Sequence, residues 1–207
     1  MFGNIPSVQH IVMMAVAFLT ALTIHEYAHA RAALAAGDDT AKQAGRISLN
    51  PIDHLDPVGT IMFAFMLMNG WGIAWGKPVP VNPYNFKSPR WDSLKVSLWG
   101  PLSNLLMAFV LGMIVRFVPL PISGVYVQLI ETCVLINLML AFFNLIPVPP
   151  LDGSKIFSSL LPYETARKFD YTMGRYGLII LLALLFTGIV GTIIGPPVYI
   201  LYYLFVG

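Results

Sequence analysis

The stretch IVMMAVAFLTALTIHEYAHARAALAA, residues 11–36, decides the fold. It is apolar for long enough to cross the hydrocarbon core of a bilayer, which takes about 20 residues of helix. It also contains His25, Glu26 and His29, arranged in the pattern H-E-x-x-H. Ionisable groups inside a membrane helix are costly and usually functional. The stretch therefore predicts a membrane helix that carries a chemical site.

The composition of the whole chain agrees with a membrane protein. Of its 207 residues, 57% are hydrophobic and 11% are charged. A soluble domain has about 25% charged residues, so this chain lacks the polar surface that a soluble globule needs. The net charge of +2, with scattered Lys and Arg, excludes nucleic acid as an expected partner. The single cysteine excludes an intrachain disulfide.

Apolar runs divide the chain into membrane segments. Besides residues 11–36, they cover residues 57–76, 96–115, 125–147 and 176–207. The last run contains Gly195, Pro196 and Pro197, which should break a helix. We therefore expect a span over 176–194 and a final segment that lies in the interface or dips back. The first run lacks the basic start and cleavage site of a signal peptide. We expect one membrane domain over residues 1–207.

The H-E-x-x-H pattern indicates a metal site. His25 and His29 lie four residues apart, so on a helix both imidazoles share one face and can bind one zinc ion. Glu26 is rotated by about 100° and can reach a water molecule on that ion. The alternative is that both histidines hydrogen-bond to neighbouring helices. Three adjacent ionisable groups in a bilayer helix favour the metal.

A catalytic zinc site takes three protein ligands, so a third is expected elsewhere. The metzincin extension is excluded, because Ala32 and Ala35 stand where it requires Gly and His. The remaining candidates are Glu131, Cys133, His54 and Asp152. Asp152 is the best of these. It lies in NLIPVPPLDG (144–153), where prolines end the preceding helix and a glycine allows a tight turn.

On these motifs the sequence resembles the site-2 protease family of intramembrane zinc metalloproteases, over nearly the whole chain. HEYAH (25–29) and NLIPVPPLDG (144–153) are similar to its two motifs, and GPLSN (100–104) to its G-P-x-x-N element. GRISLNPIDHLDPVGT (45–60) and KPVPVNPYNF (77–86) look like stretches of short members without a PDZ or CBS domain. The resemblance implies one zinc ion bound by His25, His29 and Asp152, with Glu26 as general base.

The topology follows from the same ligand set. One ion can bind all three ligands only if the C-terminal ends of helices 11–36 and 125–147 lie on one side of the membrane. Residues 57–76 should therefore enter and leave by the same face, turning at Asn69-Gly70. This arrangement places eleven of the 12 Lys and Arg on one side, with Arg116 alone opposite, as cytoplasmic enrichment requires. A full crossing would give eight against four.

We therefore predict an all-α polytopic membrane protein with about four full spans, a re-entrant segment and short extended loop segments. Its N-terminus would be external and its zinc site cytoplasmic, in a prokaryotic plasma membrane. The predicted chemistry is hydrolysis of a peptide bond in a membrane protein or transmembrane peptide, with Glu26 taking a proton from water. Asn104 and Asn144 could donate to the oxyanion, although bonding between helices explains both equally well.

Other residues have weaker predictions. His54 could assist substrate binding or proton transfer, but a histidine near Asp53 and Asp56 in a polar loop is more often structural. Residues 45–50 and the proline-rich residues 73–83 are expected to be extended. They could pair with an unwound substrate as an added strand, or be ordinary loops.

The expected partners are the substrate and the lipid bilayer, while the oligomeric state stays open. Two other classes of protein remain. A zinc transporter has no need for a glutamate beside the first ligand. A membrane scaffold without catalysis would tolerate degraded motifs, whereas both motifs are intact here.

Overall fold

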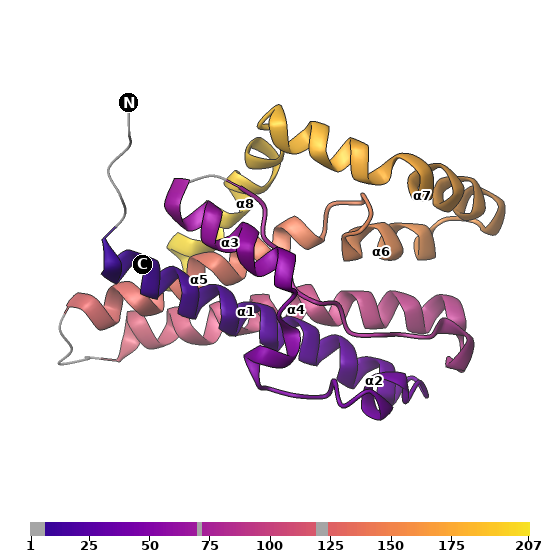
Figure 1. The fold of residues 1–207 in the computed structure, drawn as a ribbon, viewed down its shortest axis with the longest axis horizontal. Coiled ribbons are helices and arrows are strands. Elements are labelled where there is room, and N and C mark those ends of the chain that lie inside the picture. The colour runs from indigo at the N-terminus through magenta and orange to yellow at the C-terminus, as the bar shows by residue number, and fades with distance from the viewer. Residues whose placement is uncertain (1–6, 70–71, 119–123) are drawn as a thin grey trace.

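A computed structural model describes residues 7–69, 72–118 and 124–207. Figure 1 shows the arrangement of its helices. These are α1 (Val8–Ala35), α2 (Thr40–Gln43), η1 (Pro51–His54), α3 (Pro57–Asn69), η2 (Pro83–Asn85), α4 (Pro89–Phe117), α5 (Gly124–Asn144), α6 (Asp152–Leu160), α7 (Tyr163–Phe186) and α8 (Ile189–Val206). Five of them, α1, α4, α5, α7 and α8, are long and apolar enough to cross a bilayer within the described ranges. The predicted all-α polytopic fold is confirmed.

Helices α1, α4 and α5 form the bundle that carries the site (Figure 1). They approach closely because their contact faces are rich in small residues, a common solution for packing between membrane helices. On α1 the fully buried small residues are Ala17, Ala21, Ala30 and Ala33. On α4 the buried stripe is Ser97, Gly100, Asn104, Ala108 and Gly112, spaced three or four residues apart.

The C-terminal region differs from the prediction. Helix α7 ends at Phe186, and Gly188, with a φ of 74°, begins α8. Helix α8 then continues through Pro196 and Pro197, so the predicted break at these residues is wrong. Each proline removes a helical hydrogen bond, but membrane helices tolerate this loss when packing compensates. Here the neighbouring Val198 is buried against α4 and α5.

Helix α8, most of which the sequence predicted to lie in the interface or dip back, is itself long and apolar enough to cross a bilayer. Its first turns pack on the loop that precedes α6, through Val190 and Ile194. Its middle packs on α4 and α5 through Val198. Near its end, the carbonyl of Leu204 accepts a hydrogen bond of 2.6 Å from Arg116 Nη1, at the last turn of α4. Helix α8 therefore runs the length of the bundle.

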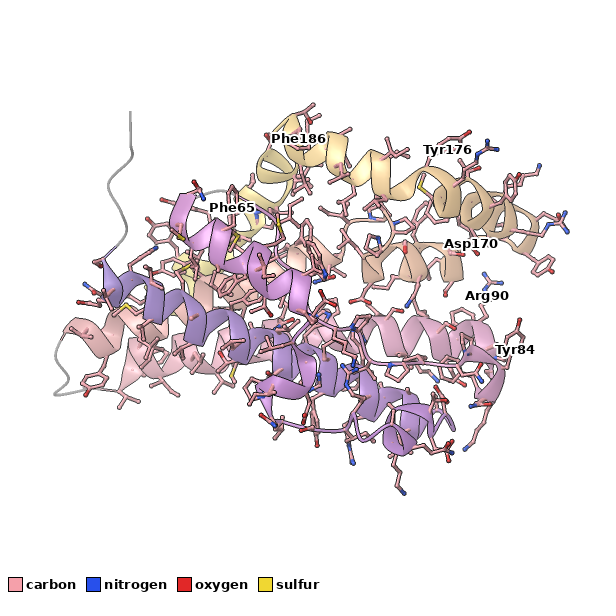
Figure 2. All side chains as sticks on the ribbon, in the orientation of Figure 1. Phe65, Tyr84, Arg90, Asp170, Tyr176 and Phe186 are labelled. Atoms are coloured by element: carbon pink, nitrogen blue, oxygen red, sulfur yellow. The ribbon has the colours of Figure 1, made fainter. Side chains whose placement is uncertain are left out.

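Helix α7 lies at the end of the bundle that carries α6. It packs mainly on α6 and α8, and its Leu181 joins the same cluster on the loop before α6 as the first turns of α8. Tyr176 and Phe186 lie on the outside of this helix (Figure 2) and are exposed. Helix α7 is also long and apolar enough to cross a bilayer, so the described residues hold five candidate spans where the sequence predicted about four.

The two ends of the segment around α3 lie together, as the predicted re-entrant arrangement requires. With 13 residues, α3 is about 20 Å long, which is less than the bilayer core of about 30 Å. Leu55 before it and Gly76 after it form an isolated antiparallel bridge, and Lys77 N donates to His54 O at 2.8 Å. The segment therefore returns to its starting point. The predicted turn at Asn69-Gly70 extends outside the described residues.

Candidate metal centre

Helix α1 places His25 and His29 on its buried face, where their residues are 4% and 8% exposed. Their rings face α4, through Asn104 and Val96, and α6, through Asp152. The two imidazole rings lie edge to face, with centroids 4.6 Å apart. The helical spacing therefore brings both rings to one place, as the motif predicted.

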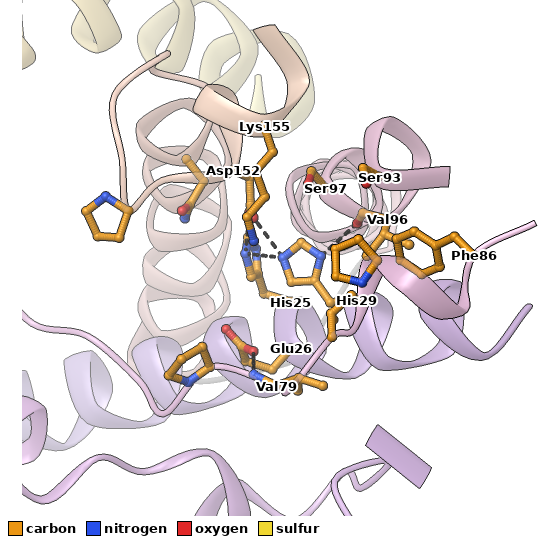
Figure 3. Close-up of a pocket in the computed structure, with 15 residues that line it drawn as sticks. His25, Glu26, His29, Val79, Phe86, Ser93, Val96, Ser97, Asp152 and Lys155 are labelled. Atoms are coloured by element: carbon orange, nitrogen blue, oxygen red, sulfur yellow. Dashed lines mark hydrogen bonds and ion pairs between the residues drawn. The ribbon is translucent and has the colours of Figure 1, made fainter. Parts of the chain in front are cut away.

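Asp152 reaches the same place from the far end of α5. Helix α5 ends at Asn144, and α6 begins at Asp152 after the proline-rich turn. Gly153 makes this turn possible, because a Cβ at this position would lie 2.3 Å from Leu145 O and 2.4 Å from Ile146 O. The motif thus folds back on the end of α5 and turns the Asp152 carboxylate towards α1 (Figure 3).

Three side-chain atoms converge at this point (Figure 3). Asp152 Oδ2 lies 3.0 Å from His25 Nε2 and 3.1 Å from His29 Nε2, and the two Nε2 atoms are 3.0 Å apart. Among the described residues, His25, His29 and Asp152 form a group that could hold a metal ion. The other third-ligand candidates, Glu131, Cys133 and His54, do not belong to this group.

The other ring nitrogens are bonded to acceptors. His29 Nδ1 lies 2.8 Å from Val96 O, a carbonyl that can only accept, so this nitrogen carries a proton. His25 Nδ1 lies 2.6 Å from Asn104 Oδ1. In the neutral imidazoles, both Nε2 lone pairs then face the Asp152 carboxylate. A cation bound between these three electron-pair donors would accept a lone pair from each of them.

The geometry fits zinc. Ligands about 2.0–2.1 Å from a tetrahedral zinc ion lie about 3.3 Å from one another, close to the separations seen here. Two nitrogen ligands and one carboxylate are a common set for catalytic zinc.

Gly100 gives the two imidazoles their space. A Cβ at this position of α4 would lie 2.4 Å from His29 Nε2 and 2.7 Å from His25 Cε1. One helical turn later, Asn104 reaches His25 Nδ1. The G-P-x-x-N element of α4 therefore forms the wall behind both histidines, with glycine for close approach and asparagine for hydrogen bonding.

Glu26 lines the same cavity, which has a volume of about 180 Å³. Its Oε2 accepts a hydrogen bond of 2.8 Å from Val79 N, in the segment between α3 and α4. Its Oε1 accepts none from the residues that the structure describes. The cavity wall also includes His25, His29, Asp152, Asn144 and Lys155. A carboxylate with one free oxygen thus stands beside the converging ligand atoms (Figure 3).

Of the residues with weaker predictions, Asn144 lies in the cavity wall, whereas Asn104 and His54 lie outside it. Asn144 lines the cavity, and its Nδ2 donates to Leu140 O at 3.0 Å. Asn104 is fully buried behind His25 and is absent from the cavity wall. His54 is also fully buried, and its Nε2 lies 2.8 Å from Ser48 O. The placement of Asn104 and His54 gives no support to substrate contact by either residue.

Sequence reasoning missed three groups around the site. Asn137 of α5 bonds to Asn104, the carbonyl of Val96 accepts from His29, and Lys155 stands on the cavity wall. Asn137 had a signal, since an amide in an apolar run must find a partner inside the membrane protein. Val96 had none, because every residue carries a carbonyl.

Comparison with known proteins agrees with the motifs. The model of peptidase family M50 matches residues 119–187. YwhC of Bacillus subtilis is 38% identical over 190 residues, which cover 88% of this chain and 84% of YwhC. Rip2 of Mycolicibacterium smegmatis is 27% identical over 176 residues, or 85% of this chain and 67% of Rip2. Zinc metalloprotease MJ0392 of Methanocaldococcus jannaschii is 35% identical over 85 residues, or 41% of this chain and 23% of that protein.

No solved structure matches the chain. The similarity to YwhC extends over most of both proteins, and it includes both halves of the candidate site. The chain therefore belongs to peptidase family M50, the site-2 protease family that its motifs resemble, and is a metalloprotease.

Proposed function

We propose that this chain is a zinc endopeptidase of a prokaryotic plasma membrane that hydrolyses peptide bonds in or near transmembrane segments of other proteins. One observation carries the proposal. Two Nε2 atoms and one carboxylate oxygen lie within 3.0–3.1 Å of one another, and Glu26 lines the same cavity. One zinc ion would be held by His25, His29 and Asp152. The printed name of MJ0392 supports zinc as the metal.

Each residue of the site has a role in this proposal. Zinc, when bound, supplies the Lewis acidity that lowers the pKa of a water molecule and polarises a peptide carbonyl. Glu26 takes a proton from the attacking water and returns it to the leaving amine. The Val79 N–H holds Oε2 of Glu26, so the proton moves through Oε1. Asn144 has one amide hydrogen beyond its bond to Leu140 O, and it can donate that hydrogen to the oxyanion.

The substrate would bind in an extended form along residues 78–83. Val79, Val81 and Pro83 alternate along this segment, and all three line the cavity. Within the described residues, Val81 N and Val79 O make no hydrogen bond. These groups are therefore available to pair with an unwound substrate. Residues 45–50 lie alongside, because Arg46 Nη2 donates to Lys77 O at 2.7 Å.

The first experiment measures zinc content and cleavage of labelled single-span transmembrane peptides by purified protein. Glu26→Gln should keep zinc and lose cleavage by about 100- to 10,000-fold, the usual contribution of a general base. Asp152→Asn should lose both. If Asp152→Asn holds zinc as tightly as the parent, the ligand set is wrong. A zinc transporter or a scaffold would be little affected by Glu26→Gln.

A second experiment tests substrate pairing. Val81→Pro removes a backbone N–H that makes no hydrogen bond within the described residues, whereas Val81→Ala keeps it. The proline variant should lose most cleavage while it retains zinc, and the alanine variant should keep both. Equal cleavage by the two variants would contradict strand pairing along this segment.

A further inference from the structure

A chain of buried hydrogen bonds leads from His25 away from the cavity, through α4 and into α5. His25 Nδ1 lies 2.6 Å from Asn104 Oδ1. Asn104 Nδ2 donates to Ala21 O and to Asn137 Oδ1, both at 2.9 Å. Asn137 Nδ2 donates to Cys133 O at 2.8 Å. Asn104 is 0% exposed and Asn137 is 1% exposed, so water does not compete for these bonds.

Two backbone carbonyls determine which group donates and which accepts in every hydrogen bond of this series. Cys133 O and Ala21 O can only accept hydrogen bonds. The NH₂ group of Asn137 must therefore face Cys133 O, which turns its oxygen towards Asn104. The NH₂ group of Asn104 must likewise face Ala21 O and the Asn137 oxygen. Its own oxygen then faces His25, and this acceptor requires a proton on His25 Nδ1.

These hydrogen bonds determine which nitrogen of His25 can bind a metal. With the proton of a neutral imidazole on Nδ1, the lone pair of His25 is on Nε2, the atom that faces Asp152. The Asn104 bond also fixes the plane of the ring. A reversed amide would put two hydrogens of Asn104 against the Nδ1 proton, and it would leave Ala21 O facing an oxygen. In a membrane interior, such unsatisfied groups are strongly destabilising, because no water is present to bond them.

We propose that Asn104 is a positioning residue that fixes the tautomer and orientation of His25 for zinc, and that Asn137 in turn fixes Asn104. This inference rests on the proposed zinc site. Partners in this outer position hold zinc-bound histidines in place in other proteins, and their loss weakens metal affinity by about 10- to 100-fold. The amide pair also joins α1, α4 and α5 at the level of the metal centre.

The test separates metal affinity from stability in the full-length protein. Asn104→Leu removes the acceptor and both donors. Asn104→Asp keeps an oxygen towards His25 Nδ1, but it turns a second oxygen towards Ala21 O and Asn137 Oδ1. Without metal, Asn104→Asp should therefore be at least as destabilised as Asn104→Leu. Zinc affinity, measured by competition with a chelator, should fall about 10- to 100-fold in Asn104→Leu, and by clearly less in Asn104→Asp.

A positioning role therefore predicts that Asn104→Asp is at least as destabilised as Asn104→Leu and yet binds zinc more tightly. If Asn104→Asp binds zinc as weakly as Asn104→Leu, the amide only supports packing and the proposal is overturned. If Asn104→Leu does not fold, two variants in α5 test the proposal instead. Asn137→Leu should weaken zinc binding, whereas Leu138→Ala, which deletes a fully buried side chain next to it, should lower stability and leave affinity unchanged. Equal zinc affinity in these two variants would also overturn the proposal.

The proposed function fails in a different way. If the parent protein binds no zinc through His25, His29 and Asp152, the metal centre itself is wrong. If the parent binds zinc and loses it in Asp152→Asn, while the Asn104 variants all bind like the parent, the positioning role alone is wrong.

Discussion

Two buried histidine environments lie beside α1, and they differ in what faces the second ring nitrogen. At His25 and His29, one nitrogen bonds to an acceptor while Nε2 faces the Asp152 carboxylate. At His54, Nε2 donates to Ser48 O, and Nδ1 has no hydrogen-bond partner among the described residues. Neither burial nor the presence of histidine distinguishes the two.

The difference lies in the convergence of electron-pair donors. Around Asp152 three electron-pair donors from α1 and α6 meet, and each of the two histidines is held by a further hydrogen bond. Around His54 a single ring closes a loop between residues 48 and 54. A metal site is therefore recognised by several lone pairs directed at one point, whereas the ring of His54 offers a single lone pair.

Exchange of each histidine for glutamine is the strongest test of this comparison. His29→Gln removes one of the three ligand atoms, so zinc affinity should fall by more than the roughly 100-fold that marks loss of an outer partner. Chelator competition on the purified protein measures the change. Zinc binding by His29→Gln at the parent's affinity would place this histidine outside the metal centre.

Gly100 offers a smaller perturbation that leaves every ligand in place. Gly100→Ala brings a methyl group within 2.4 Å of His29 Nε2. Overpacking costs about 1–3 kcal/mol, which corresponds to a roughly 5- to 150-fold loss of zinc affinity if it displaces the imidazoles. Gly174→Ala, in α7 with open space around it, is the matched control and should not change affinity. Equal affinities in the two variants would show that the imidazoles have room to move.

A substitution at Asp38 tests whether the loops near His54 can lose stability without a change in zinc affinity. Burial acts to raise the pKa of Asp38, but hydrogen bonds from Thr40, Asn82 and Asn85 lower it. The folded-state pKa is thus below the unfolded value of about 3.9. The stabilisation is present above that value and is lost as pH falls through the folded pKa.

Asp38→Asn should therefore flatten the loss of thermal stability of the metal-free protein as pH falls below about 4. Unfolding followed by tryptophan fluorescence measures this slope. At neutral pH, the variant should still bind zinc with the affinity of the parent. A slope identical to that of the parent would mean that the Asp38 carboxylate does not stabilise the fold.

The smallest effect is expected at His54. His54→Gln can still donate to Ser48 O, so it should lower stability by less than about 1 kcal/mol, the usual net value of one hydrogen bond. Zinc affinity should stay within twofold of the parent. A large loss of zinc in this variant, comparable to that of His29→Gln, would break the distinction between the two environments.

The sequence was most informative where chemistry and geometry are local. Four residues of helix fix the spacing of His25 and His29, and the prolines and glycine around Asp152 fix its turn. The re-entrant segment also followed from the sequence, because a shared ligand set requires both helix ends on one side. Leu55 and Gly76 meet as this argument requires.

Other features depend on partners that lie far away in the chain. Pro196 and Pro197 remain helical because α8 is packed along α4 and α5, which no local rule reveals. Asn104 looked equally suited to substrate and to helix packing until its partners at Ala21 and Asn137 were known. The acceptor for His29 is a backbone carbonyl, and a pattern of side chains does not predict which carbonyl a histidine will meet.

The bridge between Leu55 and Gly76 also bears on how this protein tolerates changes in length. Because both ends of the intervening segment are fixed to one another, residues could be added or removed at its tip without reversing the orientation of any later helix. The register of α4 relative to α1 would be preserved as well. This hairpin is thus a topologically neutral place where family members can vary, or where a reporter peptide can be inserted.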